Sequence, residues 1–221
     1  MNKIIDFKDV SFSTNNLYNQ VNNVKFSLKE GEKLFIDGDF GNGVEELFRL
    51  LLGLEKPKKG EILINELLVT KVDFKDLNLL YITKEPQLFD NKSVLENIKY
   101  FIKLRVKNKR DVEQILEDSL EKFDLKDICN KKANELTNFE RIKVVLARSF
   151  YRRPQIILIE NIFTNLDDEE QLETIKILKT SFLMEKTTVL LWSTKEIYNL
   201  LNGFKYKKME YGSLNYALTK L

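Results

Sequence analysis

Histidine is absent from this chain of 221 residues, and cysteine occurs only once, as Cys129. Without an imidazole there is no histidine-based serine or cysteine triad, no histidine-ligated metal site and no histidine pH switch. A single cysteine allows no internal disulfide and no thiolate cluster for zinc or iron–sulfur, which fits a reducing cytoplasm. These absences exclude several large classes of enzyme.

The chain also lacks an excess of charge of either sign. Its 36 lysines and arginines stand against 34 acidic residues, a formal net charge of +2, which gives no electrostatic reason to expect nucleic acid as the main partner. No apolar run approaches the roughly 20 residues of a transmembrane helix, and residues 1–6 acquire charge too early for a signal peptide. We therefore expect a cytoplasmic chain that meets a membrane only through a partner.

The spacing of apolar residues predicts an α/β fold in one domain. Period-two alternation in the first two predicted strands indicates an antiparallel opening. A long helical stretch in the middle predicts an inserted helical subdomain at about residues 90–150. The predicted strands cover residues 4–12, 24–28, 33–37, 60–65, 79–83, 155–160 and 187–193, the helices cover 44–52, 94–106, 111–123, 141–150 and 168–182, and a hairpin covers 204–214.

A glycine-rich segment lies between a predicted buried strand and a predicted helix. Glycines at 38, 41 and 43 would let backbone amides turn inward on an anion, as in a phosphate loop. Three glycines alone are weak evidence for a phosphate loop, but the segments that follow them, and the order of those segments, strengthen it. These are Leu136 to Arg141 before a helix, an apolar strand ending at Glu160 and Asn161, then Leu166 and Asp167, and a last apolar strand before Thr194.

That succession resembles the nucleotide-binding domain of ATP-binding-cassette (ABC) transporters, from about residue 4 to residue 212. The resemblance implies a single domain over residues 1–221 with a P-loop NTPase-like core. Its sheet would be mostly parallel, with an antiparallel β subdomain and the inserted helical subdomain. It also implies two partners: a membrane permease subunit on a separate chain, and a second ABC domain in a homodimer or heterodimer. The chain would then lie against the inner face of a membrane.

The same resemblance assigns the site residues. Walker A falls on Gly38, Asp39, Phe40, Gly41, Asn42, Gly43, Val44 and Glu45; the Q-loop on Lys84; the signature on Leu136, Thr137, Asn138, Phe139 and Glu140; Walker B and the D-loop on Glu160, Asn161 and Asp167; and the switch-histidine position on Thr194.

In Walker A this chain departs from the family pattern at the two charge-bearing positions. Val44 and Glu45 stand where the family has the phosphate-binding lysine and the magnesium-binding serine or threonine. Each lost charge-assisted hydrogen bond weakens binding by about 1.5–3 kcal/mol, and a carboxylate would repel a polyphosphate. We interpret Glu45 and Glu46 as side chains that complement the helix dipole in place of a phosphate.

The other motifs depart from the pattern as well. Glu160 replaces the magnesium-coordinating aspartate and would hold a metal weakly through its longer arm. Asn161 replaces the catalytic glutamate and cannot accept a proton, so no general base is expected there. Thr194 replaces the switch histidine, and Lys84 replaces the Q-loop glutamine. We therefore expect no catalytic residue in this chain.

In the signature, Thr137 keeps a hydroxyl group, but Asn138 and Phe139 bring side chains to a position where the family's glycines allow close approach of a phosphate. Glu140 adds negative charge there. Thr14 falls near the position of the adenine-stacking aromatic residue, and Tyr18 is close enough in sequence to substitute.

These changes together predict a pseudo-ATPase that scaffolds or regulates a transport-like membrane complex, without a resident cofactor and with MgATP bound weakly at most. Two alternatives stay open. One is a weak ATPase that energises transport and uses Glu160 for its metal. The other is a soluble interaction module with an altered groove near Phe89; in the family, residues 84–97 border the groove that accepts the permease.

Two further features favour plain structural interpretations. The stretch 103–110 holds five basic residues in eight, and we interpret it as a solvated helix end and loop rather than a lipid or nucleic-acid patch. Trp192 lies on an apolar predicted strand and is expected in or near the core.

Overall fold

The computed structural model describes residues 2–14 and 20–215. Tyr18, the candidate for adenine stacking, lies outside the described residues. Within them the chain divides into two compact units. The first contains residues 2–81, 155–161 and 184–215, and the second contains residues 82–154 and 162–183. The helical subdomain expected at about 90–150 stays a prediction.

The first unit opens with the antiparallel sheet that the alternating pattern predicts. Phe7 of β1 lies opposite Phe26 of β2, and their rings stack with centroids 4.7 Å apart. Apolar residues on one face of each strand are buried, which is why the strands alternate. Among the described residues the strand order is β2-β1-β4-β5. The strands are β1 (Lys3–Ser13), β2 (Gln20–Lys29), β4 (Lys59–Ile64) and β5 (Leu67–Leu68).

A second, mostly parallel sheet carries the segments that resemble the ABC motifs. Strand β3 runs parallel to β8 and β9, and β7 runs parallel to β8. Within the described chain the order is β10-β9-β3-β8-β7-β6, with β10 antiparallel to β9. The strands are β3 (Lys33–Asp37), β6 (Leu79–Thr83), β7 (Ile156–Glu160), β8 (Thr188–Ser193), β9 (Lys205–Glu210) and β10 (Ser213–Asn215).

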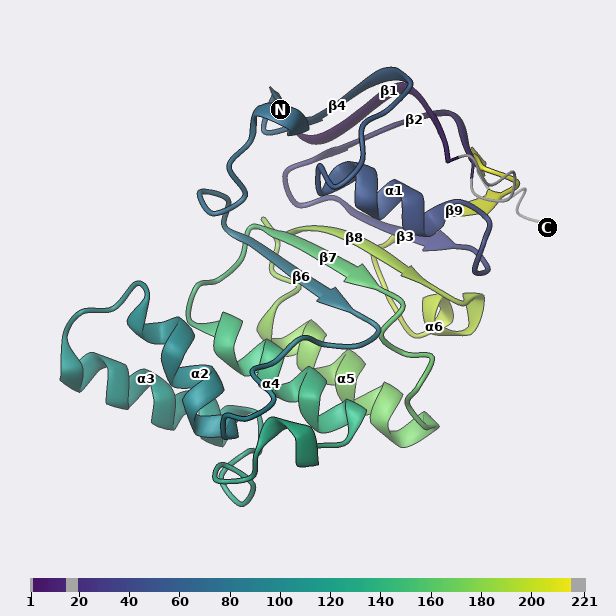
Figure 1. Ribbon diagram of the computed structural model, residues 1–221. Helices are drawn as coiled ribbons and strands as arrows, with labels where there is room; N and C mark the ends of the chain where they lie inside the picture. The colour runs from purple at the N-terminus through teal and green to yellow at the C-terminus, as the bar shows by residue number, and fades with distance from the viewer. Residues whose placement is uncertain (1, 15–19, 216–221) are drawn as a thin grey trace. The chain divides into compact units, whose positions relative to one another are not determined.

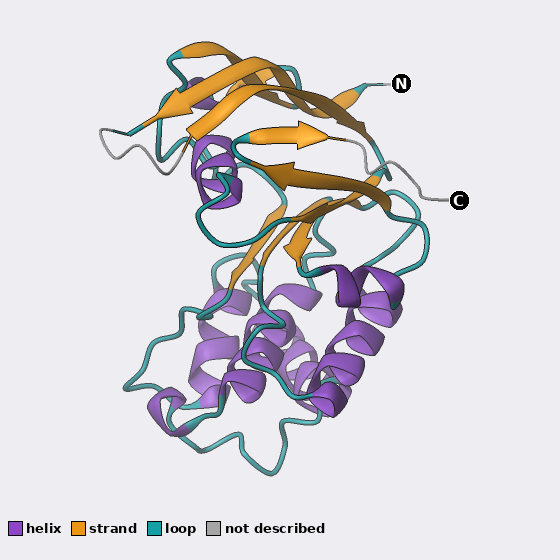
Figure 2. Cartoon of the chain, turned by 90° about the vertical axis from the view of Figure 1, so that its right-hand side faces the viewer, coloured by secondary structure: helices purple, strands orange, loops and turns teal. Residues whose placement is uncertain are grey.

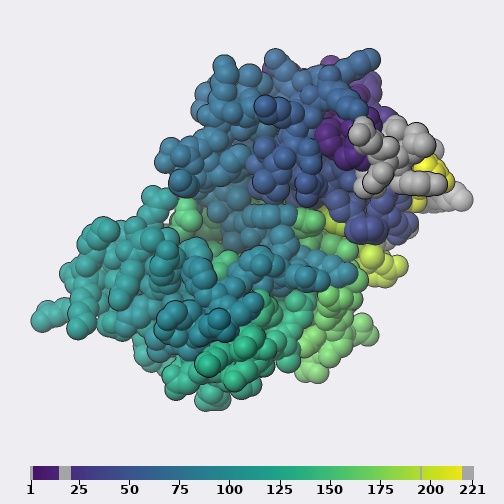
Figure 3. Space-filling view, in the orientation of Figure 1, coloured from purple at the N-terminus to yellow at the C-terminus, as the bar shows by residue number. Residues whose placement is uncertain are grey.

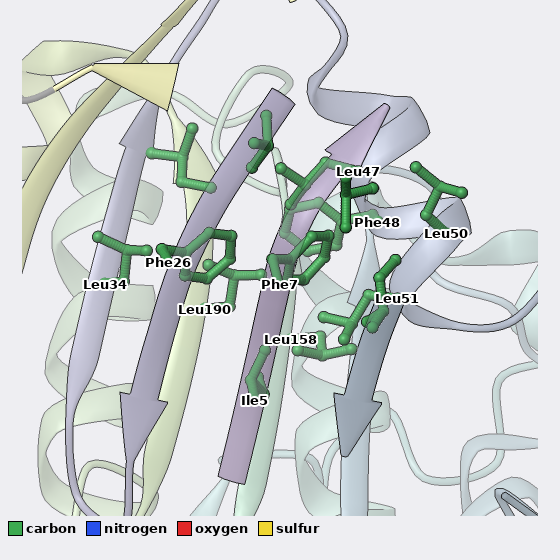
Figure 4. Packing of buried hydrophobic residues seen from close by; sticks show 14 of the residues in the cluster. Ile5, Phe7, Phe26, Leu34, Leu47, Phe48, Leu50, Leu51, Leu158 and Leu190 are labelled. Atoms are coloured by element: carbon green, nitrogen blue, oxygen red, sulfur yellow. The ribbon is translucent and has the colours of Figure 1, made fainter. Parts of the chain in front are cut away.

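Helix α1 (Val44–Leu51) joins the cores of the two sheets. Leu47 and Phe48 of α1 are fully buried and point toward Phe7 and Phe26 of the antiparallel sheet (Figure 4). Leu158 of β7 belongs to the same apolar cluster. Because α1 packs on both sheets, the loop before it, residues 38–43, is held at the end of β3.

Helices make up most of the second unit (Figure 2). Ser93, Thr137 and Asp167 each cap a helix and form a capping box with the glutamate three residues on, as expected for strong helix starts. No helix of the described residues is long and apolar enough to span a bilayer. The helices are α2 (Val94–Lys103), α3 (Lys109–Lys122), α4 (Asn138–Phe150) and α5 (Asp168–Ser181), with short 3₁₀ turns at Val69–Lys71 in the first unit and Ala133–Glu135.

The predicted α/β architecture, with a mostly parallel sheet and an antiparallel sheet, is confirmed. Several boundaries differ from the predicted ones, among them the start of α4 and the end of α2. Helix α4 begins at Asn138 rather than at residue 141, because Thr137 caps it. Helix α2 ends at Lys103 rather than at residue 106, and residues 104–108 form a connecting loop (Figure 1). The short helix α6 (Lys195–Asn199) was not predicted.

Candidate functional site

The glycine loop between β3 and α1 keeps the turn that a phosphate loop requires. Gly41 and Gly43 have φ angles of 84° and 97°, in the left-handed region that favours glycine. The N–H of Asn42 donates to the carbonyl of Asp39 at 3.2 Å. The sequence therefore keeps the backbone of the loop even where its charged side chains differ from the family pattern.

Neighbouring strands of the same unit hold this loop in place. The indole Nε1 of Trp192 donates to the carbonyl of Gly38 at 2.7 Å. In the turn between β9 and β10, the N–H of Gly212 donates to the carbonyl of Asn42 at 3.0 Å, and the N–H of Tyr211 donates to Oδ1 of Asn42 at 3.3 Å. Sequence reasoning placed Trp192 near the core but missed these contacts, because no local motif marks them.

Val44, at the lysine position, cannot reach a phosphate. Its side chain is fully buried and packs against the end of β3: a Cβ built on Gly38 would lie 2.6 Å from Cγ2 of Val44. It belongs to the apolar cluster that α1 shares with both sheets. The position that would carry a cation in the family is therefore part of the core.

Glu45, at the hydroxyl position, places a carboxylate beside the loop. Both of its carboxylate oxygens are buried and make no hydrogen bond among the described residues. Burial raises the pKa of Glu45, and the nearby carboxylates of Glu46 and Glu160 raise it further. The N–H groups of Glu45 and Gly41 lie close enough to lower the pKa, but these smaller effects do not outweigh burial. The favourable interaction of the Glu45 carboxylate with the start of α1 therefore does not offset the cost of burying it.

Glu160, at the end of β7, already has a hydrogen-bond partner. Its carboxylate accepts a hydrogen bond from the hydroxyl of Tyr81 on β6. Burial raises the pKa of Glu160, while Tyr81 and the nearby Arg49 lower it by smaller amounts. Sequence reasoning did not find Tyr81 as the partner, since pairing of β6 with β7 is a tertiary feature.

These residues do not fit magnesium-bound triphosphate. Within the described residues there is no group of three metal-ligating side chains that could hold a metal ion. The carboxylates of Glu45 and Glu46 lie in the first turn of α1, directly after the loop; Glu46 is only 6% exposed, and its Oε2 makes no hydrogen bond to the residues that the structure describes. A phosphate bound to the backbone amides of the glycine loop would bring its negative oxygens close to the carboxylates of Glu45 and Glu46.

Asn161 and Thr194, which the resemblance assigns to the positions of the catalytic glutamate and the switch histidine, both belong to the first unit. Asn161 has a left-handed φ of 48°, and its N–H donates to the carbonyl of Trp192 at 2.9 Å, which fixes the turn after β7. Thr194 is exposed and precedes α6. Neither side chain is a proton acceptor for hydrolysis.

The remaining predicted site residues belong to the second unit. Lys84 is exposed. In the signature, Thr137 Oγ1 accepts from the N–H of Glu140 at 3.2 Å, and the Glu140 carboxylate accepts from the N–H of Thr137 at 2.8 Å. Phe139 lies beneath the ammonium of Lys143, 5.3 Å from its ring centroid. The side chains of Thr137 and Glu140 therefore accept hydrogen bonds from backbone N–H groups at the start of α4.

Leu136, Asn138 and Asp167 complete that set. Leu136 and Asn138 are half-buried, and Nδ2 of Asn138 makes no hydrogen bond among the described residues. Asp167 is exposed, and its Oδ1 accepts from the N–H of Glu170 at 2.9 Å at the start of α5. Asp167, which the resemblance assigns to the D-loop, thus acts as the cap of α5.

The raised pKa of Glu45 predicts how stability depends on pH. The folded state binds a proton at this carboxyl more tightly than the unfolded state, so the free energy of unfolding should fall as pH rises above about 4.5, up to the raised pKa. Glu45→Gln removes the charge, and at pH 7 it should stabilise the chain by about 1 kcal/mol. Urea unfolding between pH 4 and pH 8 measures both effects.

Glu85→Gln is the matched control, because Glu85 is an exposed glutamate. It should leave the slope of stability against pH as in the wild type. If Glu45→Gln has the same slope as the wild type and is no more stable at pH 7, the carboxylate is solvated rather than buried.

Comparison with known proteins reveals relatives over most of the chain. Residues 21–164 match the family model described as ABC transporter. The lipoprotein-releasing system ATP-binding protein LolD of Buchnera aphidicola is 32% identical over 169 residues, 74% of this chain and 72% of LolD. The sn-glycerol-3-phosphate import ATP-binding protein UgpC of Psychromonas ingrahamii is 26% identical over 163 residues, 74% of this chain and 44% of UgpC. The chain thus spans less than half the length of UgpC.

A solved structure resembles nearly the whole chain. It is a dimeric ATP-binding cassette in a post-hydrolysis state with ADP and Pi, with a TM-score of 0.76 at 20% identity, covering 95% of this chain and 96% of that chain. At that identity the likeness shows the fold alone. The match of the family model to residues 21–164 and the similarity to LolD show more: this chain belongs to the ABC transporter family, as a nucleotide-binding domain.

Proposed function

We propose that this chain is a non-hydrolysing subunit of an ABC-type membrane transport complex, a pseudo-ATPase that acts as scaffold or regulator. It would lie against the inner face of the membrane, with residues of about 90–150 as its helical subdomain. LolD and UgpC are named as ATP-binding proteins of a lipoprotein-releasing and an import system, which supports a role in transport.

The observation that carries this proposal is the charge at the phosphate loop. The carboxylate of Glu45 is buried beside the glycine loop, and Val44 is buried in the core at the lysine position. Without the lysine and hydroxyl contacts, an incoming triphosphate meets like charge where the family supplies a cation. Asn161 in addition offers no carboxylate to take a proton from water.

A groove on the second unit supports a partner that docks through apolar contacts. Its floor carries Phe89 and Tyr100, which are 45% and 51% exposed, with rings in T-shaped contact at 5.1 Å. The groove holds about 390 Å³ and is bordered by Lys92, Lys99 and Lys103. Part of its lining, Phe89, Lys92 and Glu96, lies in the segment 84–97 that, by resemblance, borders the groove for a permease subunit. The fold likeness to a dimeric cassette supports a second ABC domain as the other partner.

Calorimetry with MgATP tests the proposal directly. We expect no saturable heat from the purified chain at about millimolar nucleotide, because two charge-assisted contacts worth about 1.5–3 kcal/mol each are missing. Titration without magnesium is the control for a divalent-dependent site. Micromolar binding together with release of phosphate from ATP would overturn the proposal and favour the weak-ATPase alternative.

A further inference from the structure

Four lysines of the second unit converge on one cavity between α2 and α3. The cavity holds about 400 Å³, and its lining includes Lys99, Lys103, Lys107 and Lys109 with a single acidic residue, Glu113. The four lysines come from α2, from the loop of residues 104–108 and from the first turn of α3. Lysines from two helices and the loop between them thus line one basic pocket.

The carboxylate of Glu113 does not neutralise the positive charge of this pocket. Glu113 Oε1 lies 2.6 Å from Nζ of Lys99, so this carboxylate is already paired. The hydrogen bond from Lys99, and then the charges of Lys109 and Lys103, lower the pKa of Glu113. Lys107 adds a further positive charge at the same cavity.

Apolar side chains are exposed beside the lysines. Leu104, in the loop between the helices, is 53% exposed, and Tyr100 on α2 is 51% exposed. The basic cavity shares Lys99 and Lys103 with the aromatic groove of Phe89 and Tyr100. In Figure 1, α2 and α3 lie side by side and the loop between them projects beyond them; Figure 3 shows the teal surface of this part of the chain at its left side.

We propose that this lysine pocket and the neighbouring Leu104 and Tyr100 bind an anionic phospholipid surface, with a phosphate headgroup held by Lys103, Lys107 and Lys109. Basic clusters attract anionic lipids, and an exposed leucine and tyrosine suit the boundary between headgroups and acyl chains. The proposal departs from the interpretation of residues 103–110 as a solvated helix end and loop, and from the expectation that the chain meets a membrane only through a partner. The site is separate from the phosphate loop and needs no nucleotide.

Lipid fits this surface better than nucleic acid. Surfaces that bind nucleic acid typically carry aromatic side chains and arginines that stack on bases. An exposed aliphatic side chain such as Leu104 makes no favourable contact with a phosphate backbone. The balanced charge of the whole chain, +2, offers no broad electrostatic footprint for a duplex. The basic residues are instead concentrated at one end of a helix pair, beside an apolar groove.

Vesicle cosedimentation of the full chain tests the proposal. We expect binding to vesicles of phosphatidylcholine mixed with phosphatidylglycerol and none to phosphatidylcholine alone. The triple variant K103Q/K107Q/K109Q should lower the partition coefficient by about 100-fold, and raised salt should weaken wild-type binding. Leu104→Ser should lower it further when combined with the triple variant.

The matched control removes the same charge elsewhere. K56Q/K58Q/K59Q deletes three exposed lysines of the first unit and should bind vesicles like the wild type. Circular dichroism checks that each variant is folded.

Three results would overturn the proposal. One is equal binding to neutral and anionic vesicles. Another is an unchanged partition coefficient for K103Q/K107Q/K109Q. A third is displacement from the vesicles by inorganic phosphate or duplex DNA at concentrations that do not disturb vesicle charge, which would assign the pocket to a free phosphate or to nucleic acid. Because neither nucleotide nor permease is present, none of these results bears on the proposed pseudo-ATPase function.

Discussion

The double variant V44K/E45S is expected to bind MgATP at least about 100-fold more tightly than the wild type. It restores the lysine and the hydroxyl that the family uses for phosphate and magnesium, and two such contacts are worth about 3–6 kcal/mol together. The backbone of the loop already has the required turn, with left-handed glycines at 41 and 43. Removing Glu45 also removes the buried carboxylate beside the loop.

Calorimetric titration with MgATP measures the gain. The matched control V44M/E45Q removes the same carboxylate and offers an unbranched chain at position 44, but it supplies neither cation nor hydroxyl. We expect it to bind no better than the wild type. Equal affinity of V44K/E45S and V44M/E45Q would mean that the loop is closed to nucleotide for reasons other than these two side chains. In that case the explanation of the pseudo-ATPase by charge would be wrong.

Trp192→Ala is expected to cost about 4 kcal/mol in the free energy of unfolding. Trp192 is 3% exposed, packs 6.4 Å from the ring of Phe48, and donates from Nε1 to the carbonyl of Gly38 at 2.7 Å. Truncation leaves a large cavity under α1 and an unpaired buried carbonyl at the start of the phosphate loop.

Trp192→Phe separates the two contributions. It keeps most of the packing and loses the hydrogen bond, so we expect a cost of about 1–2 kcal/mol. Because the chain has one tryptophan, unfolding in urea should be followed by circular dichroism rather than fluorescence. Phe40→Ala, on the same loop and 87% exposed, is the control and should change stability by less than about 0.5 kcal/mol. Equal costs for Trp192→Phe and Phe40→Ala would remove any role for the indole hydrogen bond.

Most of the fold could be predicted because its signals are local. Alternation in residues 4–12 and 24–28 predicted the antiparallel pair β1 and β2, and apolar runs predicted β7 and β8. Helix α6, of five residues, was missed since so short a segment carries no apolar periodicity. The end of α2 was placed too late because Leu104 and Val106 continue a helical pattern, although the chain turns at residues 104–108.

The candidate site was only partly predictable for the same reason. The order of glycines, apolar strands and helix starts can be read from the sequence, and it indicated the family that the comparisons show. Whether a side chain at a motif position is buried, paired or exposed is not local. Glu160 accepts from Tyr81 across two strands that are far apart in sequence, and no spacing rule predicts that contact.

The sequence by itself determined the α/β architecture, the family, and the chemistry that is missing: no histidine, no lysine at position 44 and no carboxylate at position 161. Residue identity decides which protons and phosphates can be bound at all. Only the tertiary structure decided that the carboxylate oxygens of Glu45 are buried beside the phosphate loop, that Trp192 donates a hydrogen bond to that loop, and that four lysines line one cavity between α2 and α3. Burial and electrostatic coupling depend on distances between residues remote in sequence, which packing alone sets.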